Sequence, residues 1–119
     1  MKTLLLIPFL LLFTFSFAQQ TEKVNSSIHK SESQNTISSV SAYPNPFNVA
    51  TKINFQSTKI QLVEFSVKNL LGKTVYVEKV NCKSGYNTIL FNRDMLIKGM
   101  YIYTLQTENN IISKRLVIR

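Results

Sequence analysis

The pattern of hydrophobic and polar positions divides the chain into three parts. Residues 4–15 form an apolar run that only Pro8 and Thr14 interrupt. A polar stretch without a sustained period follows, and from about residue 40 onward apolar and polar residues alternate. A period of two is that of a β-strand, because successive side chains of a strand point to opposite faces. We therefore expect residues 41–119 to form a β domain.

The alternation predicts strands separated by turn signals, at residues 51–56, 61–69, 74–80, 86–91, 100–107 and 111–119. Short strands at intervals of about 8 to 12 residues, with no helical period, are typical of an antiparallel β-sandwich. Two sets of alternating residues are expected to face the core: Val63, Phe65 and Val67, and Tyr101, Tyr103 and Leu105. The fold class is therefore all-β, as a single small antiparallel sandwich.

The connections between these strands carry further expectations. Gly72 is predicted to supply a positive φ in the turn after residue 69, and Gly99 to let the chain enter the next strand without a Cβ clash. In the longer connection at 92–99, Met95, Leu96 and Ile97 are expected to tuck under the domain. In the last strand, parity places Lys114 on the same side as the apolar residues.

The first part of the chain resembles an export signal. Lys2 precedes the apolar run, and Ser16-Phe17-Ala18 has the small residues of a signal-peptidase site, which predicts cleavage between Ala18 and Gln19. The run is shorter than the roughly 20 residues that a membrane-spanning helix needs. We therefore expect a signal peptide at 1–18, no transmembrane segment in the mature chain, and a flexible polar linker at 19–40.

Composition narrows the functional classes. The formal net charge is +8, which favours anionic partners, but most lysines are scattered along the domain and predict no nucleic-acid site. Cys82 is the single cysteine, so no intrachain disulfide is expected. The domain has no histidine and few acids, and it lacks a nucleophile or phosphate-loop motif. We therefore expect no enzyme activity, no cofactor and no metal site.

Five short motifs occur in order through the domain: Tyr43-Pro44-Asn45-Pro46-Phe47-Asn48, Val67-Lys68-Asn69-Leu70-Leu71-Gly72-Lys73, Gly85-Tyr86-Asn87-Thr88, Gly99-Met100-Tyr101 and Lys114-Arg115-Leu116-Val117-Ile118. Each is weak alone, but together they are specific, and the resemblance that they carry covers essentially all of residues 41–119. In this order they resemble the type A C-terminal sorting domain of the bacterial type IX secretion system.

The resemblance implies a seven-stranded immunoglobulin-like sandwich that the outer-membrane translocon recognises as an address. It also implies a sortase-like peptidase that removes the domain and attaches the cargo to anionic lipopolysaccharide. The protein would then be secreted or held at the outer cell surface, after passage through the periplasm. The sorting-motif residues carried over are Pro44, Asn45, Pro46, Gly99, Tyr101, Lys114 and Arg115. Among these, the basic pair on the last strand, whose edge is expected to be open, is predicted to act in recognition.

Two features depart from the family pattern. Ile97 stands where the family usually has a proline before the Gly-x-Tyr motif. In addition, the family's domains follow a large cargo, whereas only residues 19–40 separate the expected signal peptide from the domain here. The sequence leaves open whether the chain is a fragment or a stand-alone module. An alternative function is therefore a secreted immunoglobulin-like binding or adhesion module for a glycan or a cell surface.

Overall fold

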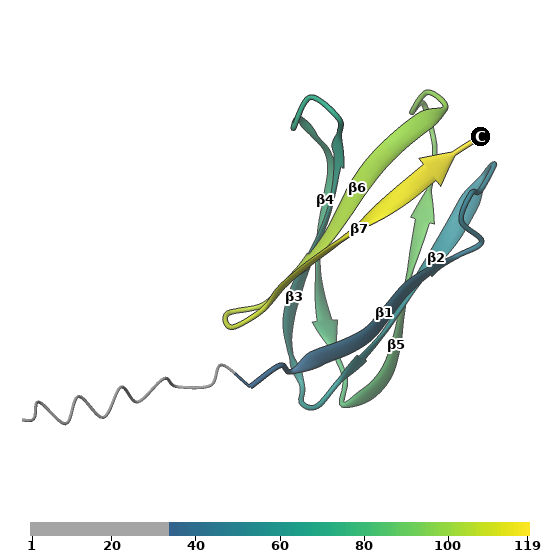
Figure 1. The fold of residues 1–119 in the computed structure, drawn as a ribbon. Coiled ribbons are helices and arrows are strands. Elements are labelled where there is room, and N and C mark those ends of the chain that lie inside the picture. Colours follow the sequence, from purple (N-terminus) through teal and green to yellow (C-terminus); the bar gives the residue numbers. More distant parts are fainter. Residues whose placement is uncertain (1–33) are drawn as a thin grey trace, which may run out of the picture.

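The computed structural model describes residues 34–119, which form seven strands and no helix (Figure 1). The strands are β1 (Ile37–Tyr43), β2 (Ala50–Ser57), β3 (Gln61–Asn69), β4 (Thr74–Cys82), β5 (Gly85–Asn92), β6 (Gly99–Gln106) and β7 (Ile111–Ile118). The expected signal peptide, its cleavage site at Ala18 and Gln19, and most of the expected linker lie outside the described residues. Within residues 34–119, no helix is long and apolar enough to cross a membrane.

The strands pair antiparallel in two sheets that pack face to face. One sheet has the order β1-β2-β5, and the other has the order β4-β3-β6-β7. The expected all-β sandwich is therefore confirmed. The six strands that alternation predicts are present, with bounds that differ from the expected ones by at most two residues.

Alternation missed the first strand, β1. Ile37 and Val40 are both buried although they are three residues apart. The pairing of β1 with β2 shifts register between Ser38 and Ser41, and Ser39 has a φ of 53°. An irregularity of this kind breaks the period of two that sequence analysis relies on. Residues 37–40, which fall within the expected linker at 19–40, therefore belong to the sheet.

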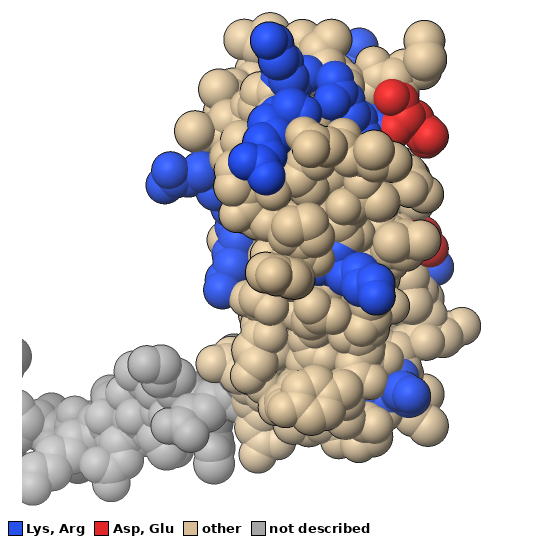
Figure 2. Space-filling model, turned by 90° about the vertical axis from the view of Figure 1, so that its right-hand side faces the viewer, with Lys and Arg blue, Asp and Glu red and all other residues tan. Residues whose placement is uncertain are grey.

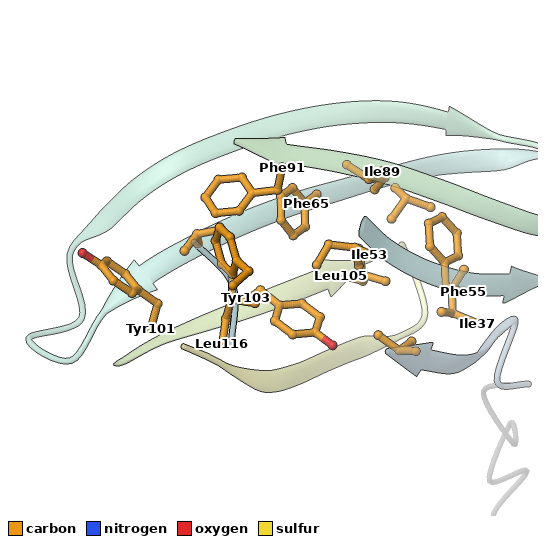
Figure 3. Packing of buried hydrophobic residues seen from close by; sticks show 14 of the residues in the cluster. Ile37, Ile53, Phe55, Phe65, Ile89, Phe91, Tyr101, Tyr103, Leu105 and Leu116 are labelled. Atoms are coloured by element: carbon orange, nitrogen blue, oxygen red, sulfur yellow. The ribbon is translucent and has the colours of Figure 1, made fainter. Parts of the chain in front are cut away.

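Aromatic and aliphatic side chains together fill the space between the sheets (Figure 3). The ring of Phe65 meets those of Phe91 and Tyr76 edge-on, with centroids 5.7 Å and 5.9 Å apart. Edge-to-face contacts of this kind add to the stabilisation from burial alone. The predicted core residues are confirmed as buried, namely Val63, Phe65, Val67, Tyr101, Tyr103 and Leu105.

The connection between β5 and β6 packs differently from expectation. Leu96 is half-buried against the core, but Met95 is 95% exposed and Ile97 is 77% exposed. The Leu96 N–H donates to the Arg93 carbonyl at 3.0 Å, which closes a tight turn and directs the two neighbouring side chains outward. The expectation that all three apolar residues tuck under the domain was therefore wrong for Met95 and Ile97.

Truncation of Phe65 to Ala should destabilise the domain by about 3–5 kcal/mol, because removing a buried aromatic ring leaves a cavity. Leu62→Ala on the same strand is the matched control, since Leu62 is 53% exposed and its loss should cost below about 1 kcal/mol. Urea unfolding of the three proteins would measure the difference. Equal midpoints for the two variants would contradict the core assignment.

Burial raises the pKa of Tyr103 above its ordinary value of 10.0. The folded chain therefore holds the phenol proton at a pH where the unfolded chain has released it. The contribution to stability is complete well below pH 10 and is lost as the pH rises past the unfolded value. Urea unfolding between about pH 8 and pH 11 should show a steeper loss of stability for wild type than for Tyr103→Phe. Parallel curves would refute this.

Candidate functional site

Most of the sequence motifs converge on one end of the sandwich, the upper end in Figure 1. Strand register explains this convergence: Gly99 pairs with Ile118, and Asn69 pairs with Tyr101. We call this region the motif end, and it comprises residues 43–49, 69–73, 93–101 and 115–119. Only the Gly85-Tyr86-Asn87-Thr88 motif begins at the opposite end, beside the turn between β4 and β5.

The Asn45 side chain joins the first motif to the last strand. Its Nδ2 donates to the Arg115 carbonyl at 3.0 Å, and its Oδ1 accepts from the Val117 N–H at 3.0 Å. These are the two bonds that a neighbouring strand would make with β7. On either side of Asn45, the exposed residues Pro44 and Pro46 have no N–H to satisfy, and the Pro44 carbonyl accepts from Thr51 Oγ1 at 2.6 Å.

Phe47 continues this contact along β7. Its N–H donates to the Val117 carbonyl and its carbonyl accepts from the Arg119 N–H, both at 3.0 Å, in a short parallel bridge opposite Ile118. The Phe47 ring is 1% exposed and packs on Phe91, with centroids 6.1 Å apart. The expected open edge of β7 is thus wrong for its last part, because residues 45–47 occupy the backbone groups there.

Backbone hydrogen bonds and one side chain hold the turn between β3 and β4, where the Asn69 N–H donates to the Lys73 carbonyl at 2.9 Å. Asn69 Oδ1 accepts from the N–H groups of Leu71 and Lys73, each at 3.0 Å. Gly72 has a φ of 84°, which confirms the predicted positive value. This arrangement leaves Leu71 94% exposed at the tip of the turn. The exposed leucine is therefore presented on a fixed backbone.

Two side chains fix the connection between β5 and β6. Tyr101 Oη donates to the Ile97 carbonyl at 2.7 Å. Arg93 donates from Nε to the Leu96 carbonyl at 2.9 Å, and from Nη1 to the carbonyls of Arg119 and Asn48 at 3.1 and 3.4 Å. Arg93 therefore bridges three segments of the motif end. Sequence analysis missed it, since an arginine in a connection has no periodic signal.

Gly99 contributes through its backbone. Its φ is 150°, which L-residues with a side chain rarely adopt, whereas a Cβ placed there would meet no atom within 4 Å. The expected Cβ clash would therefore be with no other part of the fold, and it is the local clash with the adjacent backbone that a positive φ causes.

The structure separates the two residues of the expected basic pair. Lys114 Nζ reaches across to β1 and donates to the Val40 carbonyl at 2.6 Å. Arg115 lies on the opposite face of β7, paired with Ile102. Adjacent residues of a strand point to opposite faces. Lys114 thus links the edge strands of the two sheets, and Arg115 is the member that faces outward.

The motif end presents apolar side chains together with cations. Seven large apolar side chains are exposed there, namely Tyr43, Val49, Leu70, Leu71, Met95, Ile97 and Met100. A shallow groove of about 270 Å³ lies between the two connections and is lined in part by Leu70, Ile97 and Lys98. Figure 2 keeps the motif end at the top and shows Lys and Arg gathered towards it. Asp94 is the one acidic residue within this end.

No group of three or more His, Cys, Asp or Glu residues that could hold a metal ion is present between residues 34 and 119. Cys82 is buried in the core as a free thiol, with Sγ 3.7 Å from the Lys59 carbonyl.

Comparison with known families gives one match that covers most of the chain. The family model of the secretion system C-terminal sorting domain matches residues 41–119. The chain therefore belongs to this family, whose domains are export signals for type IX secretion. Such a signal implies export to the cell surface or release from the cell. A search of curated proteins finds no match.

Replacement of Asn45 by Ala should remove both side-chain bonds to β7. Each such bond contributes about 0.5–1.5 kcal/mol, so the free energy of unfolding should fall by about 1–3 kcal/mol. Asn48→Ala in the same loop is the matched control and should change stability by less than about 0.5 kcal/mol. Chemical denaturation of both variants tests this. An equal loss in both would show that Asn45 holds no special position.

Proposed function

We propose that the motif end is the surface by which the outer-membrane translocon of the type IX system recognises this domain in its folded state. The observation that carries the proposal is convergence. Motifs that lie as far apart in sequence as residues 43–48 and 115–118 meet at one end of the sandwich. A partner that binds this end would contact most of the sorting-motif residues at once.

The geometry of the loops favours binding to a protein. Side-chain hydrogen bonds from Asn69, Arg93 and Tyr101 hold the backbone of both connections. Loops that are already ordered lose little conformational entropy when a partner binds. They present Leu71 and Met95, both more than nine-tenths exposed, and methionine adapts its shape readily to a binding surface.

The sorting-motif residues divide into two roles under this proposal. Asn45, Pro44 and Pro46 build the surface by fixing the first motif against β7. Gly99 and Tyr101 fix the connection that carries Ile97. Lys114 supports the fold through Val40, and Arg115 is left to attract acidic groups of the partner. The basic pair therefore acts as two residues with separate tasks.

The later steps implied by the family belong to the same proposal. The strongly cationic domain would be drawn to anionic lipopolysaccharide, and a sortase-like peptidase would then remove the domain and attach the rest of the exported chain to lipopolysaccharide. The excess of Lys and Arg over acidic residues supports the first of these steps. Mass spectrometry of the exported chain, with and without the peptidase, would detect both removal of the domain and a lipopolysaccharide conjugate.

Delivery of a reporter to the cell surface tests the recognition surface directly. A reporter inserted before the sandwich should be delivered by the wild-type domain in cells with an active type IX system. The triple variant Leu71→Ser, Met95→Ser and Ile97→Ser should reduce delivery about tenfold or more, because exposed apolar contacts at a fixed site commonly dominate binding. Arg115→Ser should give a smaller loss, since rim charges act mainly on the association rate.

The control carries serine at Ile60 and Leu62, which are exposed at other positions of the sandwich. It should be delivered like wild type. Thermal unfolding of each purified variant must show an intact fold. Full delivery of the folded triple variant would contradict recognition at the motif end, and full delivery of a domain that lacks β7 would contradict the need for a folded domain.

A further inference from the structure

The sandwich has four edge strands, and three of them carry features that discourage pairing with another chain. β1 has the register shift near Ser39, and β7 is partly covered by residues 45–47. β4 carries Glu78 and Lys79. Irregularities, covered edges and charges are the usual protections of an exposed strand. These three edges are therefore unsuited to strand addition.

The fourth edge, β5, has none of these protections. Its sequence, GYNTILFN, contains no charge and no proline. It pairs with β2 in unbroken register from Gly85 to Asn92. No strand of residues 34–119 pairs with its other side. An edge that is long, regular and uncharged is suited to pairing with a further strand.

The register shows which groups this edge offers. The Arg93 N–H donates to the Val49 carbonyl at 2.9 Å, in line with the pairing of Asn92 with Ala50. Along a strand of an antiparallel pair, one residue directs its backbone N–H and C=O groups to the partner strand, and the next residue directs them away from it. The odd-numbered residues of β5 therefore bond to β2. The even-numbered residues direct their N–H and C=O groups to the open side, and they are Tyr86, Thr88, Leu90 and Asn92.

We propose that the β5 edge is a dimerisation site, and that its partner is β5 of a second copy of this chain. The copies would pair antiparallel about a two-fold axis at Thr88. In this register Tyr86 lies opposite Leu90 of the second copy, and Thr88 lies opposite Thr88 of the second copy. Tyr86 is 74% exposed and Leu90 is 56% exposed. Aromatic–aliphatic and Thr–Thr pairs are favourable across strands.

The symmetry makes the site self-complementary and closed. A two-fold interface uses the same surface on both copies, so neither copy keeps a free β5 edge, and only the irregular β1 edges remain. Two continuous three-stranded sheets would become one six-stranded sheet. Shifting the axis by one residue would place Tyr86 opposite Asn92 and Leu90 opposite Thr88, which separates the apolar pair. The exposed apolar residues therefore select Thr88 as the axis.

A positively charged residue lies at each end of the proposed dimerisation site. Lys83 and Arg93 flank the strand, and in the proposed register Lys83 of one copy approaches Arg93 of the other. Arg93 is turned towards Asn48 and Arg119 of its own chain, which limits the repulsion. Because salt screens like charges, dimerisation should become tighter as the ionic strength rises. An association carried by opposite charges would weaken instead.

Disulfide cross-linking of the full chain tests both the partner and the register. Thr88→Cys should give a reducible dimer under mild oxidation, because directly opposite, hydrogen-bonded residues lie about 5.5 Å apart, within the range that a disulfide spans. The natural Cys82 is buried and should not contribute. Leu90→Cys alone and Ser113→Cys, on the edge strand β7, should remain monomeric on non-reducing gels.

Sedimentation provides a second measurement that needs no cysteine. Thr88→Lys places like charges opposite each other at the axis and should raise the dimer dissociation constant about fivefold or more. Ser113→Lys should leave it unchanged. The proposal fails if wild type is monomeric throughout, if Thr88→Cys cross-links to a different protein, or if Leu90→Cys self-cross-links better than Thr88→Cys. Circular dichroism of each variant confirms that the fold is retained.

Discussion

The contact between residues 45–47 and β7 is the constraint on which the rest of the motif end depends. The Asn45 amide and the Phe47 backbone occupy the outer backbone groups of the last strand, while the Phe47 ring enters the core. One short segment therefore satisfies an edge, closes the end of the sandwich and positions the loop that precedes β2. Because the two prolines offer no N–H groups, the segment makes these contacts through Asn45 and Phe47 without continuing as a strand. Arg93 then joins the same region to the connection after β5.

Much of this fold could be predicted from the sequence, because six of the seven strands have a solvent face and a core face. Phe65 and Tyr103 follow the period of two and are buried as expected. The exceptions have local causes. β1 carries a register shift between Ser38 and Ser41, and the buried residues Ile37 and Val40 therefore do not follow the period of two. Met95 and Ile97 are apolar but are directed outward by a turn, and composition alone gives no sign of that.

The site was less accessible to sequence analysis than the fold. Motif order identified the family and the residues to consider, yet it assigned Lys114 and Arg115 one shared role. Their opposite orientations follow from strand geometry, but the Val40 carbonyl that receives Lys114 lies on a strand that alternation missed. Arg93 had no signal in the sequence because two of its three acceptors, the carbonyls of Asn48 and Arg119, come from distant segments. Tertiary contacts of this kind become visible only when the strands are placed in space.

The pairing of residues 45–47 with β7 also bears on the order of events during export. The segment lies at the beginning of the domain and its partner lies at the end, so the surface they create does not exist in a partly synthesised or unfolded domain. A receptor that binds this surface would therefore distinguish a folded domain from an unfolded one, as well as a sorting domain from other domains. A chain whose sorting domain is truncated or unfolded would lack the surface, and the secretion machinery would thereby exclude that chain without a separate step.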